Sequence, residues 1–335
     1  MKKIQVLFIL GGTDNMKKWQ QLSSAGVISM LLLAACAEEE TKTTDKENTV
    51  QQTNVTSTET AQFPVTVKDA LGKEITLEAT PKRIISTIPS NTEILFGLGL
   101  SEEIIGVNDS DNYPEEALTK EKIGGMEFNL EQMIAMQPDL VVAHESGLYS
   151  FGEEAIAQLE SVGIPVFVVK NAVTFEETYT TMQQIGQLTG KTQEAEKMIA
   201  SIKNGIADIE KKVTELEEKS VFILVGTEPD LYAAGQETFI DEMLDVLNVE
   251  NAVPELGWPM YSAEQFVSSN PDAVLVTYES DLDAISNNPA FTEMDAVKSS
   301  NIKLVDGDTT SRQGPRIVEG IESIAEAIYP EAFNE

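Results

Sequence analysis

The stretch "EQMIAMQPDLVVAHES", residues 131–146, recurs as "EQFVSSNPDAVLVTYES", residues 264–280, at an offset of 133 residues. Each copy has apolar residues at helical spacing, then Pro-Asp, then four consecutive apolar residues. This order predicts a helix, a turn and a strand buried on both faces, as in a parallel α/β sheet. Solenoid repeats recur every roughly 20 to 50 residues, so a single recurrence at this distance indicates two similar domains. The predicted fold class is therefore α/β, with two Rossmann-like lobes.

Residues 1–35 predict an export signal. Two lysines precede an apolar run, 25–35, which ends in small residues. The run is shorter than the about 20 residues that a helix needs to cross a bilayer. Because residues 1–15 begin with their own "MKK", we take Met16 as the start of translation.

The single cysteine, Cys36, follows this signal. The sequence "LAAC" resembles the bacterial lipobox, whose cysteine becomes the lipidated first residue of the mature protein; the alternative is a buried free thiol. Residues 37–62 contain no apolar residue larger than valine, so they cannot build a core. We expect residues 36–62 to be a lipidated cysteine and a disordered tether. The acyl chains would then hold an exported protein on the outer face of the cell membrane.

The composition excludes several classes of function. A formal net charge of −33 excludes nucleic acid as a partner. One histidine, His144, and one cysteine cannot build a multi-histidine metal site, and no resident cofactor is expected. No hydrolase motif occurs, so we expect no enzyme. Two alternatives stay open: a hydrolase that uses His144 with nearby carboxylates, and an adhesin or structural lipoprotein with a vestigial cleft.

Residues 191–219 predict one long helix. They contain no proline, and their 29 residues would span about 44 Å as a helix. One lobe does not need that length, so the helix is expected to cross both. The predicted domains are an N-terminal lobe, 63–190, this backbone helix, and a C-terminal lobe, 220–335. In the first lobe, Ser90 and Glu93 have the spacing of a capping box.

Several stretches now carry a family resemblance: "IISTIPSNTEILFGLGL", "NLEQMIAMQPDLVVAHESG", "GWPMYSAEQFVSSNPDAVLV" and "RQGPRIVEGIESIAEAIYP". In this order they resemble the periplasmic binding proteins for cobalamin, ferric siderophores and haem, and most strongly the cobalamin-binding branch. The resemblance covers about residues 64–333. It implies a helical-backbone (class III) solute-binding lipoprotein of an ABC importer, acting as a monomer. Its partners would be a permease dimer with ATPase subunits and a small metal-chelate ligand.

The ligand is expected in a cleft between the lobes. In open α/β sheets ligands bind beyond the carboxyl ends of the strands, where His144 and Tyr278 follow the two repeated strands. The resemblance places Trp258 and His144 on aromatic positions that grip the corrin ring, and Ser110 on a third such position. The candidate ligand-binding residues are Ser90, Ser110, Tyr113, Met126, His144, Tyr232, Trp258, Tyr278, Thr309 and Arg312.

The charge of the cleft ranks the possible ligands. Anionic siderophores are usually matched by several arginines, and only Arg312 and Arg316 are available here; exposed salt bridges are the alternative role for both. A corrinoid therefore ranks first, a ferric hydroxamate second and haem third. Haem is retained because His144, with Met126 or Tyr278 opposite, could supply axial ligands.

Two glutamates are candidates for docking to the permease. In the resembling cobalamin system, one glutamate on each lobe pairs with permease arginines, and the matching residues are Glu153 and Glu264. Both are expected at helix starts, so favourable contact with the helix dipole is the alternative. Ser262 with Gln265 also has the spacing of a capping box there.

Overall fold

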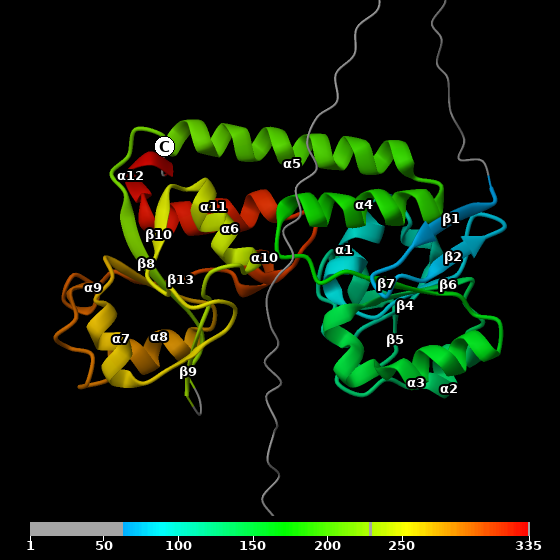
Figure 1. Ribbon diagram of the computed structural model, residues 1–335, viewed down its shortest axis with the longest axis horizontal. Helices are drawn as coiled ribbons and strands as arrows, with labels where there is room; N and C mark the ends of the chain where they lie inside the picture. Colours follow the sequence, from blue (N-terminus) through cyan, green and yellow to red (C-terminus); the bar gives the residue numbers. More distant parts are fainter. Residues whose placement is uncertain (1–62, 228–229, 334–335) are drawn as a thin grey trace, which may run out of the picture. The chain divides into compact units, whose positions relative to one another are not determined.

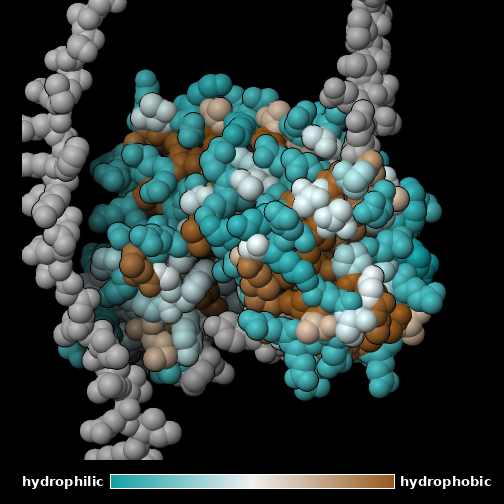
Figure 2. Space-filling view, turned by 45° about the vertical axis from the view of Figure 1, so that its right-hand side comes forward, coloured by the Kyte–Doolittle hydropathy of each residue, from teal (hydrophilic) through white to brown (hydrophobic). Residues whose placement is uncertain are grey.

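The computed structural model describes residues 63–227 and 230–333. The predicted signal region, Cys36 and the predicted tether lie outside these residues. Within the described ranges, no helix combines the length and apolar character that crossing a bilayer requires. Hydrophilic residues dominate the face drawn in Figure 2, as the net charge of −33 leads us to expect.

The N-terminal lobe is built on a five-stranded sheet with the order β5-β4-β3-β6-β7, and all its strand pairs are parallel. A separate antiparallel hairpin, β1 with β2, precedes it. The strands are β1 (Val65–Lys68), β2 (Glu74–Leu77), β3 (Ile84–Ser86), β4 (Ile104–Val107), β5 (Glu121–Lys122), β6 (Leu140–His144) and β7 (Val166–Val169). The α-helices are α1 (Pro89–Gly97), α2 (Leu130–Ala135), α3 (Leu148–Ser161) and α4 (Phe175–Thr189).

The C-terminal lobe has a six-stranded sheet with the order β11-β9-β8-β12-β13, in which β10 also pairs with β8. Strands β10, β8, β12 and β13 are parallel, whereas β9 and β11 form an antiparallel edge. The strands are β8 (Lys219–Gly226), β9 (Leu231–Ala233), β10 (Val249–Asn251), β11 (Met260–Tyr261), β12 (Ala273–Val276) and β13 (Ile302–Leu304). The helices are α6 (Phe239–Val246), α7 (Ala263–Ser269), α8 (Glu279–Ser286), α9 (Asp295–Lys298), α10 (Gly307–Ser311), α11 (Ile317–Ile328) and α12 (Pro330–Phe333).

The repeated stretch forms the same unit in both lobes, as predicted: α2, turn and β6 in one, α7, turn and β12 in the other. In both lobes the aspartate of the Pro-Asp turn binds a backbone N–H of the neighbouring strand's first residues or the residues just before it. The Asp139 carboxylate accepts a hydrogen bond from the Lys82 backbone N–H at 2.8 Å, and the Asp272 carboxylate accepts one from the Ser220 N–H at 2.8 Å. Each aspartate thus ties the start of its own strand to the start of the neighbouring one.

One helix, α5 (Thr192–Val213), packs against α4 of the first lobe and against α6 and α11 of the second. It runs along both lobes in Figure 1. Its buried residues recur every three or four positions, which gives one apolar face toward the two lobes: Ala195, Ile199, Ile202, Ile206, Ile209 and Val213. Its 22 residues correspond to about 33 Å.

The predicted extent of this helix, 191–219, is too long at its C-terminal end. The Thr214 hydroxyl bonds back to the Glu210 carbonyl at 2.6 Å, and the Leu216 N–H donates to the Val213 carbonyl in a tight turn. Lys219 already belongs to β8, where it pairs with β10. The helix therefore ends where the chain must enter the second sheet.

The predicted capping box at Ser90 is also wrong. The cap residue of α1 is Ile88, which makes no side-chain hydrogen bond, and Pro89 is the first helical residue. Ser90 lies inside the first turn of α1, and the Glu93 carboxylate turns toward two arginines of the other lobe. A tertiary ion pair has replaced the local capping contact.

Candidate functional site

His144 ends β6 and is buried at the carboxyl edge of the first sheet. Its Nδ1 accepts a hydrogen bond from the Ser146 backbone N–H at 3.1 Å and lies 2.8 Å from the Ser146 hydroxyl oxygen. Burial lowers the pKa of His144 to about 4, so the ring is neutral at pH 7. Because Nδ1 accepts from an amide, Nε2 carries the proton. This Nε2 is buried and has no hydrogen-bond partner in the described part of the chain.

Further polar side chains lie beside His144, just beyond the ends of neighbouring strands. The Asn91 amide donates to the carbonyls of Ala143, at 3.0 Å, and Val142, at 3.4 Å. The Asn108 amide donates to the Thr87 carbonyl at 2.9 Å. A buried polar atom without a partner costs about 1–3 kcal/mol, so such atoms mark places where a ligand or water is expected. Among described residues, the unpartnered atoms at this edge belong to Ser90, Asn91, Asp111 and His144.

Asp111 is the acidic member of this polar edge. Burial raises its pKa to about 6, although neighbouring Thr92 and Asn108 and the positive charges of Lys122 and Arg312 favour its charged form. The Lys122 ammonium donates to the Asp111 backbone carbonyl at 2.9 Å and so holds the loop after β4. The floor of the first lobe is polar and hydrogen-bonded rather than apolar.

The second lobe has a pocket of about 500 Å³ at the carboxyl ends of β12 and β13. Tyr278, with 61% of its surface exposed, and Asp308 contribute to its lining. Thr309 lies in the adjacent α10 but is buried, and its hydroxyl donates to the Asp306 carbonyl at 3.2 Å. Of these predicted residues, Tyr278 lines the pocket, whereas Thr309 supports the wall behind it.

An exposed apolar group lies along the antiparallel edge that continues from the end of β8. Met260 of β11 pairs with Tyr232 of β9, so their side chains share a face of the sheet. Trp258 precedes β11 and is 55% exposed, and Leu256 and Met260 are also exposed. Grouped exposed apolar side chains are typical of a binding surface. Of the predicted residues, Trp258 belongs to this group, and half-buried Tyr232 lies beside Met260 at its border.

Arg312 forms salt bridges, but it is largely buried rather than solvent-exposed as its alternative role required. Its side chain is 11% exposed, and its guanidinium donates to the Glu93 carboxylate and to the Asn112 side-chain oxygen, both at 2.8 Å. It also pairs with Asp308 at 2.8 Å. The Asn112 amide in turn donates to Asp308 at 2.7 Å. Arg312 therefore joins the two lobes.

Arg316 completes this ion cluster. Its guanidinium donates two hydrogen bonds to the Glu93 carboxylate, at 2.6 and 2.9 Å. Its carbon lies 4.1 Å from the centre of the Tyr113 ring, a cation–π contact. Glu93 is fully buried between both arginines. Tyr113 is thus packed on one face while part of its ring stays exposed.

The remaining predicted ligand residues have separate environments. Ser110 is exposed, and its backbone N–H donates to the Asn108 side chain at 2.8 Å. Met126 is 87% exposed in a loop, which excludes a core role. The prediction omitted Glu93, Asn91 and Asp111. Their positions in helix α1 and in the loop after β4, both beyond strand ends, were the available signal.

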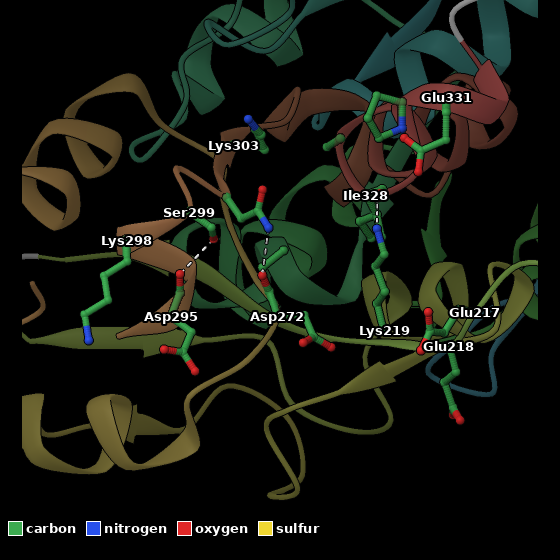
Figure 3. A pocket seen from close by; sticks show the side chains of 14 residues that line it. Glu217, Glu218, Lys219, Asp272, Asp295, Lys298, Ser299, Lys303, Ile328 and Glu331 are labelled. Carbon is green, nitrogen blue, oxygen red and sulfur yellow. Dashed lines mark hydrogen bonds between the residues drawn. The ribbon is translucent and has the colours of Figure 1, made fainter. Parts of the chain in front are cut away.

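A larger pocket, of about 770 Å³, lies at the opposite edge of the second sheet (Figure 3). It is formed where β8, β12 and β13 begin, and charged side chains of both signs surround it. The Lys219 ammonium there donates to the Ile328 carbonyl at 2.8 Å, and the Asn301 amide to the Asp272 carbonyl at 3.3 Å. Parallel sheets present ligand sites at their carboxyl edge, so this pocket is not the candidate site.

Both candidate docking glutamates are exposed at helix starts, as expected. Glu264 lies in the first turn of α7, where Ser262 and Gln265 form the predicted capping box. Glu153 follows Gly152, whose φ of 75° breaks α3. Neither carboxylate forms an ion pair with another described residue.

No cluster of three or more potential metal-ligating His, Cys, Asp or Glu side chains occurs in residues 63–227 and 230–333. Two α/β lobes that share one long helix define a class III solute-binding protein. The chain belongs to the periplasmic binding protein family, whose model matches residues 84–309.

Individual relatives agree with this assignment. The chain is 39% identical over 324 residues to the "uncharacterized ABC transporter substrate-binding lipoprotein YvrC" of Bacillus subtilis, covering 96% of this chain and 100% of that one. It is 27% identical over 282 residues to a cobalamin-binding protein of Halobacterium salinarum, covering 80% and 74%. A crystal structure of a possible iron-binding (periplasmic solute-binding) protein from Staphylococcus epidermidis has 38% identity and a TM-score of 0.69, covering 75% and 100%.

The protein is therefore the substrate-binding component of an ABC importer of the B12, siderophore and haem family, and its family is one of transport proteins rather than enzymes. Such a component works outside the cytoplasm with a permease and an ATPase, and carries a small-molecule ligand.

Proposed function

We propose that the protein captures a corrinoid in the cleft between its lobes and delivers it to a membrane permease. It acts as a monomer, held to the outer face of the cell membrane by a lipid on Cys36. The lobes extend over residues 63–190 and 220–335, and the helix between them forms the backbone.

The observation that carries this proposal is the exposed apolar group beside the end of β8. Tyr232, Trp258 and Met260 offer a broad aromatic and thioether surface, and Tyr278 is exposed at the end of β12. A large flat macrocycle covers such a surface well, since aromatic side chains stack on flat rings. A hydroxamate siderophore, which presents a more polar surface, uses it less fully.

His144 has a defined chemical role in this proposal. Its buried Nε2–H can donate to an amide carbonyl on the rim of a corrin. Coordination of cobalt would require the proton to move to Nδ1, because a metal binds the unprotonated nitrogen. That tautomer would lose the hydrogen bond from the Ser146 N–H. The described geometry favours hydrogen bonding over coordination.

The visible spectrum of protein purified from its own cells tests the proposal, because each ligand class has its own absorption bands. We expect corrinoid bands, and quenching of Trp258 fluorescence when cyanocobalamin is added to ligand-free protein. A Soret band, or the charge-transfer band of a ferric hydroxamate, together with failure to bind cyanocobalamin, would refute the corrinoid assignment.

Iron transport is the second candidate, with a ferric hydroxamate or haem as ligand. It is favoured by the 38% identity with the possible iron-binding protein of Staphylococcus epidermidis. Titration with ferrioxamine and with haemin, under the same conditions as cyanocobalamin, decides between the two. Tighter binding of an iron chelate would replace the corrinoid with iron as the transported cargo.

A further inference from the structure

Two carboxylates hold both guanidinium groups of the C-terminal lobe. Glu93 receives two hydrogen bonds from Arg316 and one from Arg312, and Asp308 forms a second ion pair with Arg312. The cluster contains two positive and two negative side chains, so its formal charge is zero. The third arginine of the chain, Arg83, donates instead to the carbonyls of residues 136 and 137, at the amino edge of the first sheet.

The cluster meets the candidate site through its acidic side. Asp308 lines the pocket of about 500 Å³, and its side chain is 41% exposed. Arg312, which pairs with Asp308, and Arg316 do not line this pocket, and their side chains are only 11% and 10% exposed. A ligand that enters this pocket therefore meets a carboxylate before it meets a guanidinium.

An anionic ligand would gain little from these arginines. Guanidinium groups recognise carboxylates and catecholates through paired N–H donors. Two N–H donors of Arg316 already bind the Glu93 carboxylate. The exposed Asp308 carboxylate would also repel an anion. Buried Asp111 is another acid near Arg312.

We propose that Glu93 and Asp308 determine the charge selectivity of the cleft: by occupying Arg312 and Arg316 they make it accept neutral or cationic chelates and reject anionic ones. This inference rests on the proposed ligand-binding role of the cleft. It assigns the specificity to two acids that do not belong to the aromatic surface. Asp308 acts directly at the pocket, whereas Glu93 is a positioning residue that acts through the arginines.

The test measures binding of an anionic ferric tris-catecholate to wild type, Asp308→Asn and Glu93→Gln by calorimetry. Asp308→Asn should bind this probe about tenfold more tightly than wild type, and added salt should weaken the gain because it screens exposed charges. Glu93→Gln should show a gain in the same direction. The matched control is Glu279→Gln, which removes an exposed acid from the same pocket without releasing an arginine.

Each outcome has a defined meaning. A gain in Asp308→Asn that Glu279→Gln does not share supports the proposal. Equal small gains in both variants would show that general charge, not the release of Arg312, governs the probe, and would overturn it. Tight binding of the probe by wild type would overturn it as well. If Glu93→Gln does not fold, Asp308→Asn still decides.

Failure of the corrinoid assignment is distinguishable from failure of this inference. A wild-type protein that does not bind cyanocobalamin refutes the proposed ligand. The comparison of tris-catecholate binding among the variants does not depend on that result.

Discussion

Arg316 and Glu93, 223 positions apart in the sequence, form an ion pair between the lobes through two hydrogen bonds. The distances from the guanidinium nitrogens to the carboxylate oxygens are 2.6 and 2.9 Å. The Glu93 side chain is fully buried, and that of Arg316 is 10% exposed. A buried charge that loses its partner keeps its desolvation cost, so single removal is more harmful than the net value of the pair. The contact fixes α1 of one lobe to the start of α11 in the other.

Arg316→Gln should lower the free energy of unfolding by about 3 kcal/mol, since Glu93 would keep only Arg312 as a charged partner. Urea denaturation at pH 7 measures this change. The double variant Glu93→Gln with Arg316→Gln should lose less than the sum of the single losses, because no unpaired charge stays buried.

Lys211→Gln is the control for this pair. Lys211 and Asp208 form an ion pair on α5 at 2.8 Å with both side chains mostly exposed. Such pairs contribute little, so no measurable change in unfolding is expected. A loss equal to that of Arg316→Gln would contradict the importance given to burial.

Glu242 makes a second contact between the lobes that should depend on pH. Its carboxylate accepts a hydrogen bond from the Phe175 N–H at the start of α4, and burial raises its pKa to about 7, with Asp245 and Glu176 adding repulsion. A raised carboxyl pKa means that the folded state binds the proton more tightly. Stability from this group is thus present below pH 4.5 and lost as pH rises through 7.

Glu242→Gln should therefore be more stable relative to wild type at pH 8 than at pH 5. The relative gain should be about 1–2 kcal/mol, a value reduced for solvent screening because Glu242 is only half-buried. Urea denaturation at both pH values measures it. Glu196→Gln, an exposed change on α5, is the control, and a similar pH dependence in that variant would contradict the assignment.

His144 should show the opposite dependence. Its pKa is lowered by burial to about 4, from 6.5 in the unfolded chain, so the folded state loses stability as pH falls from 6.5 toward 4. The difference in unfolding free energy between wild type and His144→Gln should shrink by about 2–3 kcal/mol over this range.

Nuclear magnetic resonance can check His144 directly, because it is the only histidine of the chain. Its imidazole signal should titrate near pH 4 in the folded protein and near 6.5 in urea. A midpoint near 6.5 in the folded protein would show that the ring is accessible to water.

The sequence repeat predicted the fold because the turn chemistry is local. Gln137 and Asn270 precede the two prolines, and both adopt left-handed conformations, with φ values of 49° and 36°. The helix end and the Ser90 cap were predicted wrongly because both depend on distant partners. Lys219 pairs with β10, and Glu93 finds Arg316, contacts that no local pattern contains.

The candidate site was predictable where residues follow strand ends. His144 and Tyr278 lie there because the repeated strands end at those positions. The pairing of both arginines was not predictable, since charge counting shows how many arginines exist but not which acids they meet. For the same reason the role of Thr309, a buried support rather than an exposed contact, required the structure.

Trp258→Ala should weaken binding of the captured ligand by about 1–3 kcal/mol, the cost of losing an aromatic anchor. Trp258→Phe should retain part of that affinity, since a smaller ring still stacks. Calorimetric titration measures both. Leu118→Ala, which truncates an exposed apolar residue of the other lobe, should leave affinity unchanged; equal losses would mean that Trp258 is not a ligand contact.

The docking assignment of Glu153 and Glu264 gives the last prediction. Reversing both charges, with Glu153→Lys and Glu264→Lys, should abolish uptake in cells, because the two new lysines would repel the arginines that this docking assignment expects on the permease. Ligand binding by the purified double variant should persist, since both side chains are exposed and unpaired among the described residues.

Helix capping alone predicts a different result. Glu194→Lys provides the control, because Glu194 is exposed in the first turn of α5 just as Glu264 is in α7. A lysine there meets the same positive end of a helix dipole but lies on the backbone helix. Uptake that survives the Glu153 and Glu264 reversal, or falls equally in Glu194→Lys, would make both glutamates ordinary residues of helix starts. Loss of uptake confined to the pair, with ligand affinity intact, would identify the permease-facing surface of each lobe.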